Sequence, residues 1–112
     1  MYTAGVFTKS EQIADKLFLS GKKTFERVWP MPMWDEYKKQ MDCEIADVKN
    51  LGTRWGGAIK AAKFLEHFVD ENINWTHMDI AGPSCENDLN SYTKVYHSPF
   101  GIRLMYDYLL NI

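Results

Sequence analysis

The sequence has no long hydrophobic run and no sign of an export signal. No apolar stretch among its 112 residues approaches the roughly 20 residues that a helix needs to span a bilayer. The N-terminus lacks the basic start and apolar stretch of a secretory signal. We therefore expect no membrane partner.

Cysteine is scarce, and neither sign of charge dominates. Cys43 and Cys85 lie far apart and fit no metal-binding spacing. One disulfide between them remains open, but two free thiols in a reducing cytosol are the simpler interpretation. The formal net charge is −2, and the short pairs Lys22-Lys23 and Lys38-Lys39 lie near acidic residues. A nucleic-acid partner is not expected, because such proteins usually carry a basic stripe that contacts phosphates.

What is present is typical of a folded domain. Hydrophobic residues make up 46% of the chain and charged residues 25%, as in ordinary globular proteins. A chain of this length allows one domain, so residues 1–112 are expected to form a single unit. Helix-like and strand-like patterns alternate, which predicts an α/β fold with helices packed on a small mixed or parallel sheet.

The spacing of apolar and turn residues predicts individual elements. A capping box from Thr8 to Glu11 indicates the start of a helix. This helix ends at Gly21 or continues to Val28, before Pro30. Further helices are expected at residues 34–41, at 58–69, and after Ser98 with Pro99 in the first position; strands at 5–7, 45–51 and 75–81; and a polar loop at 88–97.

The middle of the chain is expected to form a βαβ-like unit. Residues 45–51, the glycine-rich loop 52–57, helix 58–69 and strand 75–81 follow one another in the required order. The connection is long enough for a parallel pair of strands crossed by the helix. Apolar residues cover more than half of this helix, with Lys60, Lys63 and Glu66 as a narrow polar face. Such a helix is usually packed on two sides.

Several residues are candidates for chemistry, each with a structural alternative. The loop 52–57 precedes a helix and resembles an anion site, but it lacks the phosphate-loop and dinucleotide spacings. A tight turn is the alternative. His77 and Asp79 share one face of a strand and would suit a metal or an oriented base. Buried, hydrogen-bonded polar residues are the alternative.

Other candidates lack partners by spacing. Cys43 is a nucleophile only beside a histidine, and a small buried hydrophobe is the alternative. His67 and His97 have no partner by spacing. An apolar cluster around the prolines is either an interaction patch or a corner of the core; its members are Trp29, Met31, Met33 and Trp34. The residues by themselves thus give an α/β unit without a complete catalytic set.

A series of blocks carries more information than any one residue. In order, they are residues 26–33 (ERVWPMPM), Tyr37, 45–52 (IADVKNLG), 57–65 (GAIKAAKFL) and 75–82 (WTHMDIAG). Their order and spacing resemble the leucyl (cytosol) aminopeptidase family, in the C-terminal part of its catalytic domain. The resemblance covers nearly the whole chain, from Gly5 to Leu110.

This resemblance implies a zinc- or manganese-dependent exopeptidase that removes N-terminal residues such as leucine from peptides. In the family, two metal ions activate the attacking water. The family is mainly cytosolic and assembles as hexamers, which implies a cytoplasmic location and a homo-oligomer or association with other aminopeptidase chains. The family's metal ligands lie upstream of this region. Its hallmark Asn-Thr-Asp-Ala-Glu-Gly-Arg stretch is absent here. We therefore assign no catalytic and no metal-binding residue, and expect no activity from this chain alone.

The resemblance does place three residues at the substrate. Leu51 and Ala81 correspond to the wall around the side chain of the substrate's first residue, and Ser84 to a position that is often apolar in the family. The alternative is that Leu51 and Ala81 simply end strands in the core. The family often has threonine where Lys60 stands. A second hypothesis for the whole chain is a non-catalytic α/β module that self-associates or binds a partner chain.

Overall fold

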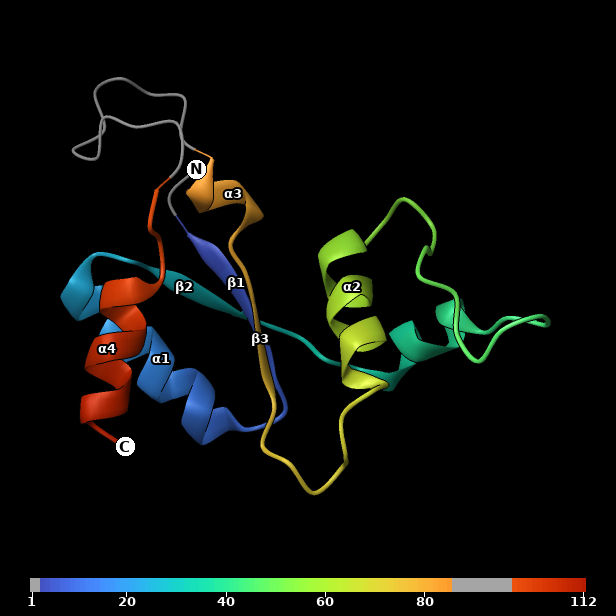
Figure 1. Cartoon of the computed structure of the whole chain (residues 1–112), viewed down its shortest axis with the longest axis horizontal. Coiled ribbons are helices and arrows are strands. Elements are labelled where there is room, and N and C mark those ends of the chain that lie inside the picture. Colours follow the sequence, from blue (N-terminus) through green and yellow to red (C-terminus); the bar gives the residue numbers. More distant parts are fainter. Residues whose placement is uncertain (1–2, 86–97) are drawn as a thin grey trace.

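Three strands form a mixed sheet at the centre of the molecule (Figure 1). The computed structural model describes residues 3–85 and 98–112, so the expected loop 88–97 and His97 lie outside the described residues. The strand order is β2-β1-β3, with β1 parallel to β2 and antiparallel to β3. The expected small mixed sheet is confirmed. The strands are β1 (Ala4–Thr8), β2 (Val28–Met31) and β3 (Thr76–Asp79).

The parallel pair belongs to a different βαβ unit from the expected one. Helix α1 (Glu11–Thr24) connects β1 to β2. The prediction of a βαβ-like unit between residues 45 and 80 is therefore wrong. Residues 45–51 form bends and not a strand, and Ile45 is 95% exposed. The alternation of apolar and polar residues there has no partner strand among the described residues, so its apolar side chains gain no burial.

Helix α1 does not use the expected capping box, and it does not end at Gly21. Ser10 is the N-cap, and its Oγ accepts a hydrogen bond from the Ile13 N–H. Thr8 instead accepts from Ser10 and donates to the Trp75 carbonyl, which ties β1 to the segment before β3. The helix passes through Gly21, where a Cβ would lie 2.8 Å from the Glu26 carbonyl oxygen. Glycine therefore permits a close approach inside the helix instead of ending it.

Strand β2 is the element that the sequence pattern concealed. Its third residue is Pro30, which was expected only to stop the preceding helix. Proline lacks the N–H that a central strand needs, but β2 lies at an edge of the sheet, where proline is tolerated.

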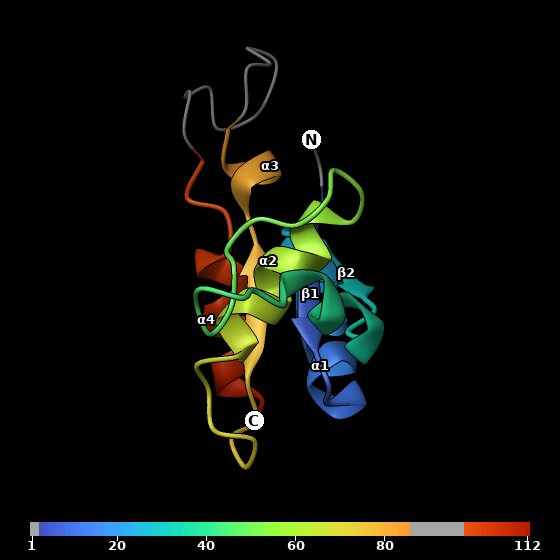
Figure 2. The same cartoon turned by 90° about the vertical axis from the view of Figure 1, so that its right-hand side faces the viewer.

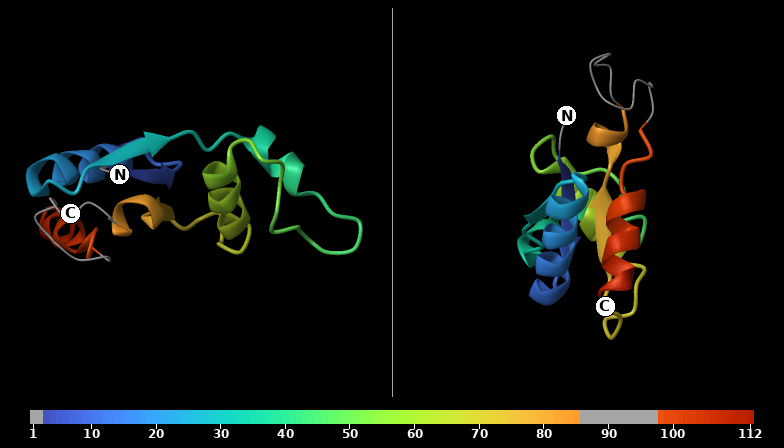
Figure 3. Two further views of the ribbon diagram at one scale, coloured as in Figure 1. Left: turned by 90° about the horizontal axis from the view of Figure 1, so that it is seen from above. Right: turned by 90° about the vertical axis from the view of Figure 1, so that its left-hand side faces the viewer.

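The two faces of the sheet carry two separate cores. Ala4 and Val6 of β1 pack with Leu17 of α1 and Leu104 of α4 (Ile102–Leu110). Phe7, on the opposite face, packs with Ile59 and Ala62 of α2 (Gly57–Glu66), together with Met33. Viewed from the two ends, the strands lie behind α2 on one side (Figure 2) and behind α1 and α4 on the other (Figure 3, right).

The remaining helices depart in part from the expected bounds. Residues 34–41 contain the 3-10 helix η1 (Asp35–Met41), and α2 ends three residues before the expected residue 69. The strand expected at 75–81 is shorter, because residues 81–84 form the helical turn α3 (Ala81–Ser84). The last helix begins at Ile102 after Gly101, not at Pro99, so Ser98 does not cap it.

Many large apolar side chains remain exposed. Helix α2 packs on one side only, since Leu65 is 43% and nearby Phe68 67% exposed. The Cα radius of gyration is 15.4 Å, against about 13 Å for a compact domain of this length. Trp29 and Trp34 are exposed whereas Met31 and Met33 pack into the core, so the expected apolar cluster is divided. No helix in the described part of the chain is long and apolar enough to cross a membrane.

Candidate functional site

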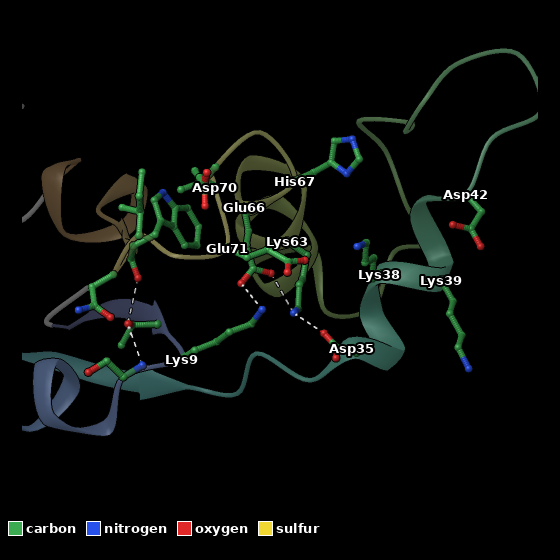
Figure 4. Close-up of a pocket in the computed structure, with 16 residues that line it drawn as sticks. Lys9, Asp35, Lys38, Lys39, Asp42, Lys63, Glu66, His67, Asp70 and Glu71 are labelled. Atoms are coloured by element: carbon green, nitrogen blue, oxygen red, sulfur yellow. Dashed lines mark hydrogen bonds and ion pairs between the residues drawn. The ribbon is translucent and has the colours of Figure 1, made fainter.

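The larger cavity is lined mainly by charged side chains (Figure 4). It has a volume of about 940 Å³ and lies between the start of α1, η1, α2 and the turn before β3. Both signs of charge line it: Lys9, Lys38, Lys39, Lys63 and His67 beside Asp35, Asp42, Glu66, Asp70 and Glu71. With cations and carboxylates mixed in this way, the cavity shows no net preference for a charged ligand.

The centre of this cavity is an ion-pair network, called here the Lys63 network: Lys9, Asp35, Lys63 and Glu66. The buried Lys63 ammonium donates to Asp35 Oδ1 at 3.0 Å and to Glu66 Oε2 at 2.9 Å. Lys9 reaches the other oxygen of Glu66 at 3.0 Å. The network joins η1, α2 and, through Lys9, the turn between β1 and α1 (Figure 4). Because Lys63 contacts carboxylates on two different elements, it ties η1 to α2.

The network shifts the pKa values of its members. Burial by itself raises the pKa of the Glu66 carboxyl, but hydrogen bonds from Lys63 and Lys9 outweigh it and hold that pKa below its usual value. The hydrogen bond from Lys63 likewise lowers the pKa of Asp35. The hydrogen bond to Glu66 raises the pKa of Lys9. All three shifts favour the charged forms in the folded state.

We expect the free energy of unfolding to fall as the pH is lowered below about 5. The folded-state pKa values of Glu66 and Asp35 are depressed, so their contribution is present above the unfolded pKa. It is lost as the pH falls through the folded pKa. Urea unfolding at pH values from 7 to 3, followed by circular dichroism, measures this dependence.

Glu66→Gln should flatten that pH dependence, because the variant cannot titrate at this position. Glu44→Gln, in the exposed segment after η1, is the matched control and should leave the slope unchanged. Equal slopes in the two variants would contradict a role for the Lys63 network.

The glycine-rich loop 52–57 is held by a lysine of α2. Lys60 is buried and donates to the carbonyl oxygen and to Oγ1 of Thr53. A Cβ at Gly52 would lie 2.6 Å from the Lys60 side chain. Gly56 precedes α2 with φ 67°, in the left-handed region. These contacts support the turn interpretation, since the loop is closed by its own lysine.

His77 and Asp79 lie on the same strand, but their side chains contact different groups. His77 stacks on Trp75, with ring centroids 6.1 Å apart, and lies 5.7 Å from the Phe7 ring. Asp79 accepts a hydrogen bond from the Ala81 N–H at 3.1 Å. The His77 ring thus makes aromatic packing contacts, whereas the Asp79 carboxylate ties β3 to α3.

Cys43 and Cys85 are both free thiols.

A second, smaller cavity lies beside α3. It has a volume of about 430 Å³ and a mainly apolar lining that includes Phe7, Met31, Ala58 and Pro83, with Asp79 as its charged residue. Gly82 and Pro83 of α3 line it, and these two residues lie between the predicted wall residues Ala81 and Ser84. An apolar cavity of this kind suits a hydrocarbon side chain through burial.

The three predicted wall residues do not line either cavity directly. Ala81 is exposed and Ser84 half-buried on α3, whereas Leu51 is 77% exposed in the segment before α2. Ala81 and Ser84 therefore lie on the same helical turn, whereas Leu51 lies in a different segment. Their role as a substrate wall stays a prediction.

The described residues do not fit a metal centre. Within residues 3–85 and 98–112, no group of three or more His, Cys, Asp or Glu side chains is arranged to hold a metal ion. We therefore derive no step of hydrolysis through a metal bound to this chain.

The residues that sequence reasoning missed have structural roles. Glu26 and the Lys63 network depend on contacts between distant segments, for which the sequence carries only the polar face of α2 as a signal.

Taken together, the fold and the site define a class of protein. A three-stranded mixed sheet with unequal helical cover and many exposed apolar side chains is typical of part of a larger α/β domain. The sequence pattern of the cytosol aminopeptidase family, catalytic domain, matches residues 1–106. The chain belongs to this family, and the expected family membership is confirmed.

Relatives agree with this assignment and show how much of their length this chain spans. The chain is 44% identical over 109 residues to a probable cytosol aminopeptidase of Chloroherpeton thalassium, covering 97% of this chain and 21% of that protein. It is 47% identical over 107 residues to one of Chlorobaculum parvum, covering 95% of this chain and 21% of the relative. The chain thus spans about a fifth of the length of these relatives.

Solved structures share the fold. A tomato leucine aminopeptidase mutant has a TM-score of 0.87 at 33% identity, covering 99% of this chain and 21% of its own. The bottromycin maturation enzyme BotP in complex with Mn has a TM-score of 0.88 at 26% identity, covering 96% of this chain and 24% of its own. In both proteins the corresponding unit is a small part of a much longer chain.

Proposed function

We propose that this chain supplies part of the substrate-side wall of a cytosol aminopeptidase catalytic domain. That domain would remove N-terminal residues such as leucine from peptides in the cytoplasm. The observation that carries the proposal is the family match over residues 1–106. The apolar cavity beside α3 supports it, because an apolar wall stabilises a leucine-like side chain by roughly 1.5–3 kcal/mol when burial is complete.

The chemistry of peptide cleavage belongs, in this proposal, to residues outside this chain. The family resemblance implies two divalent metal ions, zinc or manganese, which would polarise the peptide bond and activate water. The chain's own residues would shape and exclude water from the side-chain pocket. Asp79 accepts a hydrogen bond from the Ala81 N–H, and the Ile80 carbonyl accepts one from the Ser84 N–H, so both residues are tied to the end of β3.

A separate, non-catalytic module has no observation in its specific favour. The exposed Trp29 and Trp34 side chains are equally typical of a surface that the remainder of a larger domain covers. A homo-oligomer, or association with other aminopeptidase chains, remains part of the proposal and follows from the family.

The purified chain is expected not to hydrolyse leucine amide when manganese or zinc is titrated in. Calorimetry should detect no stoichiometric metal uptake, because the described residues offer no ligand set. The intact Chloroherpeton relative, assayed in the same buffer, is the positive control. Metal-dependent turnover that co-purifies with the 13.1 kDa chain would overturn the proposal, and His77→Ala and Asp79→Ala would then be tested first.

A further inference from the structure

The segment that connects η1 to α2, residues 42–56, lies mostly at the surface. It contains no helix or strand and projects away from α1 and α4 (Figure 1). Leu51 and Trp55 in this segment are each 77% exposed. A connection with so little buried surface is expected to move independently of the elements that it joins, unless a side chain from one of them holds it.

Lys60 of α2 holds this segment near its end. The residue is buried, with 4% exposure, and its ammonium donates to the carbonyl oxygen of Thr53 and, at 2.9 Å, to Thr53 Oγ1. The Thr53 hydroxyl in turn donates to Gln40 Oε1 of η1 at 3.1 Å. These three hydrogen bonds, called here the Lys60 clasp, join the segment to both helices that it connects. Opening the clasp would cost the buried ammonium two acceptors, which is unfavourable.

The backbone before Thr53 leaves room for the lysine. A Cβ at Gly52 would lie 2.6 Å from Lys60 Cδ and 2.9 Å from Lys60 Nζ. Gly52 is not in the left-handed region, so the close contact, and not the backbone conformation, requires glycine at this position. Leu51 directly precedes Gly52, and the clasp therefore fixes the place from which the Leu51 side chain extends.

We propose that Lys60 is a positioning residue of the substrate wall, and that the Lys60 clasp holds the apolar Leu51 side chain where a substrate side chain would meet it. The inference rests on the proposed function, with Leu51 as one of the wall residues. Lys60 itself does not contact the substrate in this arrangement, because its buried ammonium is directed at Thr53. Leu51 is available for such a contact, since it is exposed.

The clasp matters for affinity because a mobile wall has to be ordered when the substrate binds. Ordering a loop and its side chains weakens binding, whereas a loop that is already fixed in the bound arrangement avoids this cost. Loss of the clasp should therefore weaken the binding of a leucine-like side chain without changing the reaction step. The effect should be smaller for alanine, whose side chain offers Leu51 little to contact.

The first measurement is amide NMR relaxation on the full 112-residue chain. The amides of Leu51 and Thr53 should have order parameters of about 0.85, which is typical of rigid backbone, and these should fall below about 0.6 in Lys60→Met. Methionine keeps most of the apolar part of the side chain and removes the ammonium. Gly52→Ala, whose Cβ would displace Lys60, should have the same effect and decides the matter if Lys60→Met does not fold.

Gly57→Ala is the matched control for the glycine substitution. A Cβ at Gly57 would meet no atom within 4 Å, so this variant should leave the Leu51 and Thr53 amides rigid. Unchanged order parameters in both Lys60→Met and Gly52→Ala would show that the clasp does not hold the segment, and the proposal would be wrong.

The second measurement tests the link to the substrate, in a hybrid of the Chloroherpeton relative that carries this chain in place of its matching segment. Leu51→Ala should raise KM for leucine amide on the order of tenfold. Lys60→Met should raise it severalfold, with kcat within about twofold of the parent, and KM for alanine amide should change less. The double variant should have the KM of Leu51→Ala alone, because Lys60 acts through Leu51. Lys39→Met, at an exposed position of η1, is the control and should leave KM unchanged.

The outcomes separate the positioning role from the proposed function. If Leu51→Ala leaves KM unchanged, or if the hybrid has no turnover, the proposed function fails together with the role of Lys60 in it, and the order parameters still decide whether the clasp exists. If Leu51→Ala raises KM but Lys60→Met does not, the proposed function stands and the positioning role is overturned. Additive effects of the two substitutions would also overturn it, since Lys60 would then act independently of Leu51.

Discussion

Replacing Glu26 by alanine is expected to lower the free energy of unfolding by about 3–5 kcal/mol, because two buried N–H groups lose a charged acceptor and each such hydrogen bond contributes roughly 1.5–3 kcal/mol. The Glu26 side chain is buried, with 4% exposure. Its Oε2 accepts from the backbone N–H groups of Gly101 at 3.0 Å and Leu104 at 2.9 Å, and its Oε1 accepts from Arg103 Nε at 3.1 Å.

Glu26 acts as the cap of α4 from a distant part of the chain. Gly101, the N-cap residue, has no side chain to cap the helix, and the N–H groups of Gly101 and Leu104 donate to Glu26 instead. A carboxylate at a helix N-terminus is also favoured by the helix dipole. Its removal leaves buried donors without an acceptor and loosens Leu104, which is fully buried in the core shared by β1, β2, α1 and α4.

Urea unfolding followed by circular dichroism and tryptophan fluorescence measures the effect. Glu26→Gln keeps an acceptor without the charge and should lose about half as much. Glu36→Ala, at an exposed position of η1, is the control and should stay within about 0.5 kcal/mol of the parent chain. A Glu26→Ala variant as stable as Glu36→Ala would show that α4 does not depend on this carboxylate.

The sequence predicted the helices better than the connections between them. The apolar stripe with Leu17 marks α1, and that with Ala62 marks α2, because a helix buries one face whatever lies beyond it. Strand pairing is not local. Residues 45–51 have the alternation of a strand without a partner, and β2 has a partner but contains Pro30, which hides the pattern.

The candidate site was predictable only to the extent that it is local. The family blocks placed Ala81 and Ser84, and the structure brings both onto α3. Leu51 lies in a segment whose course depends on η1 and α2. The sequence also showed Lys63 and Glu66 on a polar face of α2, but not that Asp35 and Lys9 would cover that face. Such contacts join segments far apart in sequence, and periodicity carries no information about them.

The core on the other face of the sheet leads to a second large effect: Phe7→Ala is expected to lower the free energy of unfolding by about 3–5 kcal/mol. Phe7 is fully buried and packs with Met33, Ile59 and Ala62. It is the residue through which β1 holds α2, since its neighbour on the same face, Gly5, has no side chain. A Cβ at Gly5 would lie 3.1 Å from the Phe7 ring, so this ring fills the space above the glycine.

Loss of the ring would also change the smaller cavity, because Phe7 lines it. Thermal unfolding and the binding of a hydrophobic dye measure the two consequences, a lower midpoint and a larger exposed apolar surface. Phe25→Ala, at a position that is 75% exposed, is the matched control and should change stability by no more than about 0.5 kcal/mol. If the two variants lose equal stability, α2 does not pack on the sheet in solution. The cavity beside α3 would then not exist in the free chain and would form only when the rest of the domain holds α2 in place.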